Sequence, residues 1–238
     1  MFTFKPSITS GHSVQPEAYT YKVVLVGPAM AGKTCLCCRW VSDCWIDDPS
    51  ATLGAAYSLL RVTLPCSPQA EEQAQREAQR GTQSEVELQL WDTAGQELYR
   101  CLTPLYLRGC DAAVIVLDSS TSSMKNLKQD LEDWLALTQQ ASPSCLLFFA
   151  LAKVDLVSSE SVESLLSELR AYDPTPTRQR LHATSSKLGT GCSNLLESVV
   201  WELEKNRAQR VNTQIKAHTQ CEKPKTALKE DGRVERCC

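Results

Sequence analysis

The sequence predicts an α/β protein whose mostly parallel, six-stranded sheet has one antiparallel edge strand and helices on both faces. Three observations predict this fold class. Short apolar segments of strand length alternate with segments of helical periodicity, as in parallel sheets that are covered on both faces. Two neighbouring segments alternate apolar and polar residues and are expected to pair as a hairpin, which supplies the antiparallel strand. A loop that begins and ends in glycine follows the first strand and precedes a helix.

The first elements are expected in the following order. Residues 21–26 are β-branched or apolar and form the first strand. The glycine-containing loop then leads into a helix at 33–42. Strands at 57–64 and 86–91 make the hairpin because their side chains alternate in polarity. Between them, residues 65–84 are rich in Gln, Glu and Ala, and we expect a long, exposed insertion there.

The second half of the chain repeats a strand–helix pattern. The segment 125–138 is expected to be helical because Leu127, Leu131 and Trp134 recur at helical spacing. Ligands in such folds bind beyond the carboxyl ends of the strands, where the motifs described below are found. The other expected elements are a strand at 112–117, a strand at 145–152, a helix at 160–170, a strand at 181–184 and a helix at 193–205.

The composition argues against several classes of protein. The 238 residues carry 25 basic and 28 acidic side chains, a net charge of −3, which gives no reason to expect a nucleic-acid partner. A hydrophobic fraction of 42% argues against wholesale disorder. The longest clear apolar run, 145–152, is too short to span a membrane. Residues 1–14 lack the continuous apolar stretch of a secretory signal.

The 12 cysteines are expected to be reduced thiols in the cytosol, because no secretory signal is found. Four of them cluster early in the chain, but without a second C-x₂-C pair or nearby histidines. We therefore expect them to pack in the core rather than bind a metal. These residues are Cys35, Cys37, Cys38 and Cys44.

We expect one folded domain with two flexible ends. Residues 1–18 form a flexible extension, and residues 19–206 form the domain that contains the 65–84 insertion. Residues 207–238 carry eight basic and four acidic side chains, a net charge of +4, which leaves −7 for the rest of the chain. Apolar residues are sparse in this segment, which therefore predicts a flexible basic tail. The tail ends in a double cysteine, Cys237-Cys238.

The first motif with a chemical role is the phosphate-binding pattern G-x-x-x-x-G-K-[ST]. It reads Gly27-Pro28-Ala29-Met30-Ala31-Gly32-Lys33-Thr34. Backbone amides of such a loop surround a phosphate, and the N-terminus of the following helix adds its positive dipole end. Lys33 would neutralise the outer phosphates, and the Thr34 hydroxyl can bind Mg²⁺. All the loop residues from Pro28 to Thr34, and Cys35 after them, are candidates for nucleotide binding.

A second motif follows the strand at 86–91 and reads Trp91-Asp92-Thr93-Ala94-Gly95-Gln96-Glu97. Its carboxylate, Asp92, is in the position of a second group on the Mg²⁺ side of the site. Together the two motifs resemble the Ras superfamily of small GTPases, and the resemblance spans about residues 20–205. The Rab family is indicated by Leu102-Thr103-Pro104-Leu105-Tyr106-Leu107-Arg108-Gly109. The first switch of early-endosomal Rab proteins is similar to Ala51-Thr52-Leu53-Gly54-Ala55-Ala56-Tyr57.

The resemblance implies the P-loop small-GTPase fold and a switch that binds GTP or GDP with Mg²⁺. The residues it assigns to Mg²⁺ are Thr34, Thr52 and Asp92. In the GTP state, Thr52 and the Gly95 amide would also contact the γ-phosphate. Gln96 would orient the attacking water, with Lys33 and Thr52 as the other catalytic residues. Hydrolysis is slow in this family until an activating protein inserts an arginine.

Guanine recognition departs from the family pattern. The family motif N-K-x-D reads Ala152-Lys153-Val154-Asp155, and S-A-K reads Ser185-Ser186-Lys187. Asp155 can still accept hydrogen bonds from two guanine N–H groups, and the Ser186 amide can reach the base oxygen. Ala152 cannot make the hydrogen bonds of the family asparagine, a loss of roughly 1–3 kcal/mol. The other residues expected beside the base are Trp45, Lys153, Ser185 and Lys187.

The resemblance also implies partners and a location. Effectors of Rab proteins typically contact three aromatic residues, here Tyr57, Trp91 and Tyr106, for which ordinary packing is the alternative. Cys237 and Cys238 look like a signal for double geranylgeranylation, which would anchor a monomer to the cytosolic face of an intracellular membrane. The resemblance to early-endosomal Rab proteins implies an endosomal membrane, with a soluble cytosolic pool. The expected partners are exchange factors, activating proteins, effectors and a prenyl-binding escort protein.

Two other classes of function are alternatives to a cycling switch. A Rab-like scaffold that binds nucleotide weakly or does not cycle is suggested by Ala152 and opposed by the intact Lys33, Thr34 and Gln96. A P-loop kinase of small metabolites is poorly supported, because the Asp92 motif and a prenylatable tail have no purpose there. The sequence therefore favours a cycling switch in vesicle traffic.

Overall fold

The computed structural model describes residues 19–63, 85–121, 123–172 and 180–221. The predicted extension at 1–18, the insertion at 65–84 and the cysteine pair at 237–238 lie outside these residues. By internal contacts the chain divides into Met1–Leu203, which holds the fold, and Glu204–Cys238.

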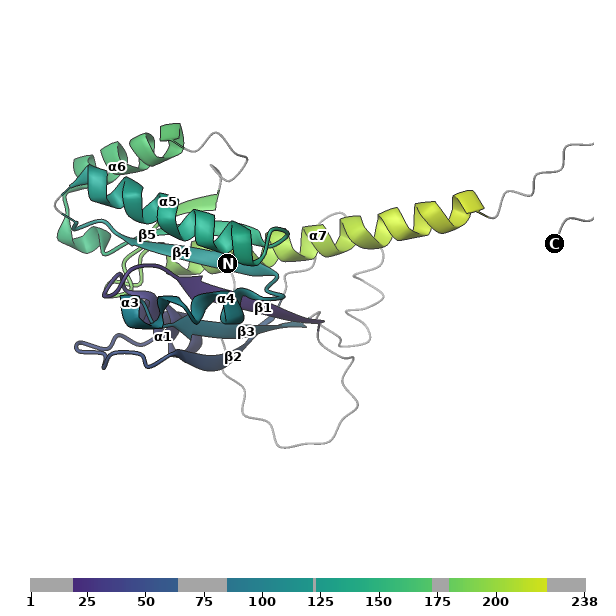
Figure 1. The fold of residues 1–238 in the computed structure, drawn as a ribbon, viewed down its shortest axis with the longest axis horizontal. Coiled ribbons are helices and arrows are strands. Elements are labelled where there is room, and N and C mark those ends of the chain that lie inside the picture. The colour runs from purple at the N-terminus through teal and green to yellow at the C-terminus, as the bar shows by residue number, and fades with distance from the viewer. Residues whose placement is uncertain (1–18, 64–84, 122, 173–179, 222–238) are drawn as a thin grey trace, which may run out of the picture. The chain divides into compact units, whose positions relative to one another are not determined.

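The sheet has six strands in the order β2-β3-β1-β4-β5-β6 (Figure 1). Strand β2 pairs antiparallel with β3, and every other pair is parallel. This confirms the predicted fold class. The bounds are β1 Tyr19–Val26, β2 Ala55–Thr63, β3 Glu85–Thr93, β4 Ala112–Asp118, β5 Leu146–Ala152 and β6 Leu181–Ala183.

Helices cover both faces of the sheet. One core cluster joins alternate strand residues such as Val23 to α1 and to the first turns of α7. The other cluster joins the opposite strand residues, such as Val24, to α4, α5 and α6. The alternation follows from the strand geometry, which points successive side chains to opposite faces. The helices are α1 Lys33–Ser42, α3 Glu97–Arg100, α4 Thr103–Leu107, α5 Met124–Ala141, α6 Ser159–Tyr172 and α7 Cys192–Cys221, with a 3₁₀ turn at Val154–Leu156.

The expected helices and strands are all present, with ends that differ by a few residues except in α7. The short helices α3 and α4 and the 3₁₀ turn were not predicted. Helix α7 continues to Cys221 rather than ending at 205, so the prediction of a flexible tail from 207 is wrong for residues 207–221. The segment lacks glycine and proline, and Arg207 pairs with Glu204 one turn away, at 2.5 Å.

No helix in the described part of the chain is long and apolar enough to cross a membrane. The four early cysteines also differ in their burial. Cys35 and Cys37 are buried in the core as expected, whereas Cys38 is half-buried and Cys44 is exposed. Among the described residues no group of His, Cys, Asp and Glu is arranged to hold a metal ion.

Candidate functional site

The loop between β1 and α1 forms the floor of the candidate site, at the carboxyl ends of the parallel strands. Gly27 has a φ of 144°, and a side chain there would collide with the backbone of Val116 in β4. Gly32 caps α1 in the left-handed region, with no hydrogen bond from a side chain to the first turn. The N–H groups of that turn therefore remain available to an anion, which the helix dipole also favours.

Lys33 is the first residue of α1 and is buried, with its side chain held by backbone oxygens of the loop. Its Nζ donates to the carbonyls of Gly27, at 2.9 Å, and Pro28, at 2.7 Å. Burial lowers the pKa of Lys33 to about 8, and the nearby Asp92 carboxylate opposes that shift. An ammonium has three N–H donors, so a third remains for a phosphate oxygen.

Thr34, Thr52 and Asp92 meet beside Lys33, as the resemblance implies. The Thr34 hydroxyl donates to Asp92 Oδ2 at 2.7 Å and lies 3.1 Å from the Thr52 hydroxyl, while Thr52 donates to the same carboxylate oxygen at 3.4 Å. Burial raises the pKa of Asp92, and the hydrogen bond from Thr34 and the charge of Lys33 oppose this.

These three side chains fit a magnesium ion. Asp92 Oδ1 is buried and has no hydrogen-bond partner among the described residues. Such an atom is costly to bury unless something binds it. Two hydroxyls and a carboxylate are the hard oxygen ligands that Mg²⁺ prefers.

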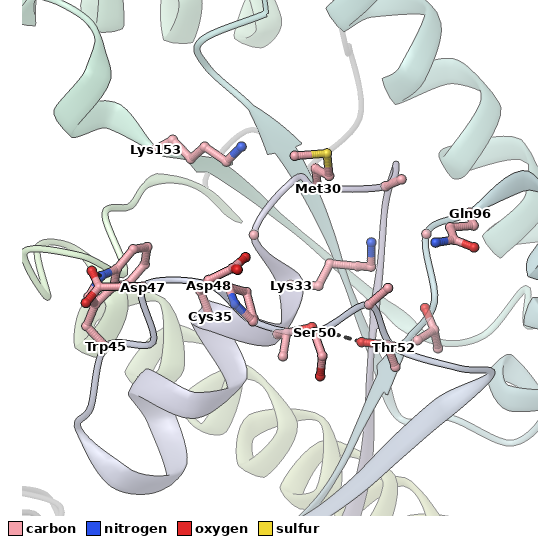
Figure 2. A pocket seen from close by; sticks show the side chains of 17 residues that line it. Met30, Lys33, Cys35, Trp45, Asp47, Asp48, Ser50, Thr52, Gln96 and Lys153 are labelled. Atoms are coloured by element: carbon pink, nitrogen blue, oxygen red, sulfur yellow. Dashed lines mark hydrogen bonds between the residues drawn. The ribbon is translucent and has the colours of Figure 1, made fainter.

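A cavity of about 510 Å³ lies above the loop and is lined by most of the predicted nucleotide-binding residues. In Figure 2, Trp45 and Asp47 lie at one end, Gln96 lies at the other, and Lys33 and Thr52 lie between them. The predicted residues that line the cavity are Ala29, Met30, Gly32, Lys33, Thr34, Cys35, Trp45, Thr52, Gly95, Gln96 and Lys153. The structure does not place Pro28, Ala31, Asp155, Ser185, Ser186 or Lys187 in its wall.

Gly95 approaches the phosphate-binding loop too closely to carry a side chain. A Cβ there would contact Lys33 Nζ, the Pro28 carbonyl and the Ala29 amide. Gln96 is exposed and precedes α3 as its N-cap. The second motif is therefore packed on the loop through Gly95, with the Gln96 side chain free to turn toward the cavity.

Apart from Trp45, the predicted base-binding residues lie just after β5 and β6, and hydrogen bonds order the side chains of Lys153, Asp155 and Ser185. The Ser185 hydroxyl donates to Asp155 Oδ1 at 2.5 Å, and Lys153 donates to Asp118 Oδ2 at 2.7 Å. Burial opposes ionisation of Asp118, but the hydrogen bonds from Lys153 and Ser120 lower its pKa overall. Ala152 is buried, and its methyl lies 3.8 Å from the position that a Gly32 Cβ would occupy.

Several residues of the site were missed by sequence reasoning. Asp118 ends an apolar strand at the ligand edge of the sheet, and an acidic residue in that place is a usable signal. Asp47 accepts a hydrogen bond from Trp45 Nε1 at 2.7 Å, and the acidic pair Asp47-Asp48, which begins two positions after Trp45, was a further signal. The other missed residues of the wall are Asp48, Pro49, Ser50, Ala51 and Thr93.

The three predicted effector residues form one row. The ring centroids of Tyr57 and Trp91 are 5.4 Å apart, and those of Trp91 and Tyr106 are 5.9 Å apart. Tyr57 is 51% exposed, while Trp91 and Tyr106 are half-buried. In this row, therefore, one aromatic side chain is exposed and the other two pack on the domain.

Comparisons with known proteins agree with this geometry. The family model "Roc, Ras of Complex, domain of DAPkinase" matches residues 22–155, more than half of the chain. The chain is 31% identical over 187 residues to the GTP-binding protein ypt4 of Schizosaccharomyces pombe, covering 77% of this chain and 72% of that protein.

Two relatives from Dictyostelium discoideum are also similar. Identity to the putative ras-related protein Rab-5B is 35% over 154 residues, 63% of this chain and 62% of that one. Identity to the Ras-related protein Rab-5A is 28% over 224 residues, 93% of this chain and 97% of that one. The chain therefore belongs to the Ras superfamily of small GTPases, as a divergent member of the Rab family.

Proposed function

We propose that this protein cycles between GTP and GDP as a Mg²⁺-dependent switch in vesicle-mediated membrane traffic. The observation that carries the proposal is the cluster of Lys33, Thr34, Thr52 and Asp92 beside the phosphate-binding loop, together with an Asp155 that is ordered by Ser185. Small-GTPase relatives support the same reading.

The chemistry follows from the charges of the site. Lys33 neutralises the outer phosphate oxygens through its remaining N–H donor, in a buried position where a charge pair is strong. Thr34, Thr52 and Asp92 would hold Mg²⁺, which supplies positive charge beside the phosphates. Gln96 orients the attacking water. Positioning and electrostatic stabilisation of this kind carry most of phosphoryl transfer.

Switching follows from the loss of one phosphate. Thr52 and the Gly95 amide both bind the γ-phosphate in the GTP state, and hydrolysis removes that shared ligand. Thr52 lies just before β2, and Gly95 lies between β3 and α3. The segments that precede β2 and follow β3 would therefore be released together, which changes the surface that effectors bind.

Guanine selectivity would come from Asp155. A carboxylate that accepts two hydrogen bonds matches the N–H pair on one edge of guanine, and adenine lacks that pair. The hydrogen bond from Ser185 keeps Asp155 in one orientation, which reduces the entropy lost on binding. Lys153, tied to Asp118, would lay its aliphatic stem along the base, and Trp45 would pack near it.

The C-terminus would attach the switch to a membrane. Geranylgeranylation of Cys237 and Cys238 gives the two lipid chains that stable anchoring needs, and the net charge of +4 over 207–238 adds attraction to anionic leaflets. Similarity to Rab-5 proteins favours the cytosolic face of an endosomal membrane, with a soluble cytosolic pool. The partners would be exchange factors, activating proteins, effectors and a prenyl-binding escort protein, with the switch itself a monomer.

The second candidate is a Rab-like scaffold that does not cycle, which Ala152 favours because its methyl makes no hydrogen bond to nucleotide or loop. Single-turnover hydrolysis of GTP separates the two functions. We expect slow hydrolysis by the purified chain, accelerated by several orders of magnitude by the catalytic domain of a Rab-activating protein. Bound GTP that stays intact under both conditions would refute the cycling switch.

A further inference from the structure

A side chain of helix α1 is hydrogen-bonded to the backbone of the loop that follows β6. Arg39 Nε donates to the Ser186 carbonyl at 2.8 Å, and a terminal nitrogen of the same guanidinium donates to the Lys187 carbonyl at 3.1 Å. One turn of helix therefore holds two consecutive peptide groups of a segment that is 147 positions away in the chain.

The Arg39 side chain is itself fixed in place. Its other terminal nitrogen donates to the Asp43 carbonyl at 2.7 Å and to Asp43 Oδ1 at 3.1 Å. Asp43 caps α1 in the left-handed region and donates its own N–H to the Arg39 carbonyl at 3.1 Å. Only 15% of the Arg39 side chain is exposed. A planar guanidinium held this way is preorganised to grip both carbonyls, which a lysine ammonium cannot do in the same geometry.

The contact is confined to Ser186 and Lys187. The preceding Ser185 has separate partners, because its N–H donates to the Thr190 carbonyl at 2.9 Å and its hydroxyl donates to Asp155. Its hydroxyl also accepts the Leu188 N–H at 3.1 Å. Asp155 is thus ordered independently of Arg39, whereas Arg39 holds the carbonyl side of Ser186. The Ser186 N–H belongs to the preceding peptide group, whose Ser185 carbonyl accepts from Cys192 Sγ at 3.5 Å.

We propose that Arg39 is a positioning residue for the base site, which aims the Ser186 amide at the guanine oxygen and so sets how long the nucleotide stays bound. The inference rests on the proposed function and on the expectation from the family resemblance that the Ser186 amide contacts the base oxygen. Arg39 belongs to the same helix that begins under the phosphates at Lys33. The phosphate end and the base end are therefore held by one rigid element, although Ala152 provides no side-chain bond between them.

Release of two diphosphates tests this assignment. We would measure dissociation of ribose-labelled fluorescent GDP and of the matching 2-aminopurine riboside diphosphate. This analogue keeps the amino group facing Asp155 but lacks the oxygen and, with it, the neighbouring ring N–H; that second loss is the same for wild type and variants and does not involve Arg39. Arg39→Lys and Arg39→Gln should speed GDP release by about 10-fold, and they should change release of the oxygen-free analogue by less than about twofold. Arg61→Gln is the matched control. It removes a 65% exposed guanidinium that pairs with Glu87 between β2 and β3 and has no contact with the loop, so both rates should stay near wild type.

The outcomes separate this inference from the function on which it rests. Equal acceleration of both diphosphates would mean that Arg39 only stabilises the fold. Unchanged GDP release would mean that Arg39 does not position the loop. Either result overturns this inference and leaves the proposed function standing. Thermal unfolding of each variant identifies a misfolded sample. If one of the two Arg39 variants does not fold, the other still tests the inference. A wild-type chain that retains neither diphosphate overturns the proposed function and this inference with it.

Discussion

Replacing Ala152 with asparagine should slow GDP release by about 5- to 150-fold. Ala152 ends β5, is 3% exposed, and has its methyl 3.8 Å from the position of a Gly32 Cβ. Because Gly32 has no side chain, an asparagine amide at 152 has space to face the phosphate-binding loop and the base. Two new hydrogen bonds there, each worth about 0.5–1.5 kcal/mol net, give about 1–3 kcal/mol of added binding free energy.

The assay is dissociation of ribose-labelled fluorescent GDP into an excess of unlabelled GDP, with wild type and variant compared at one Mg²⁺ concentration. Ala152→Leu is the matched control, since it adds similar bulk without hydrogen-bonding groups. It should not slow release. Equal rates for wild type and Ala152→Asn, or equal slowing by both substitutions, would refute the role given to the missing hydrogen bonds.

Three further outcomes are expected. Lys33→Met should abolish retention of GDP through gel filtration, because it removes the buried ammonium of the loop; retention at the wild-type level would contradict the site. Replacing Cys237 and Cys238 together with serine should move the protein from the membrane pellet to the supernatant in cell fractionation, and unchanged recovery in the pellet would exclude the anchor. Burial, with the charge of Arg170, lowers the pKa of His182 below its usual 6.5, so the neutral form contributes stability above about pH 6.5 that is lost as the pH falls through the lowered value. The melting temperature of the His182→Gln variant should therefore fall less than that of wild type between pH 7 and pH 5. An identical fall would show that His182 does not titrate in this way.

The phosphate end of the site was predictable from sequence for a physical reason. A loop that wraps phosphate needs glycine where the backbone comes close or turns left-handed, as at Gly27 and Gly32. It also needs one lysine and one hydroxyl at fixed spacing, so phosphate binding requires particular residue types at positions that can be found in the sequence. The fold class was predictable because strand and helix periodicities alternate along the chain.

Other features of the structure have no recognisable pattern of residue types in the sequence. Arg39 binds backbone carbonyls, and a carbonyl acceptor places no demand on the residue type that carries it. Helix α7 extends past Leu203 because residues of adequate helix propensity continue without glycine or proline, although the apolar face that predicted the helix has ended. Asp118 carried a signal as the acidic end of an apolar strand, but its link to Lys153 followed only from the pairing of β4 with β5, in which Asp118 lies opposite Ala152.

The nucleotide that the purified protein retains is the most direct test of the guanine site. The chain would be stripped, incubated with equal concentrations of GDP and ADP in the presence of Mg²⁺, desalted, and its bound nucleotide identified by chromatography. Asp155 and the Ser186 amide predict retained GDP with a preference over ADP of at least about 100-fold. Retention of both diphosphates in similar amounts, or of neither, would contradict a guanine-nucleotide switch.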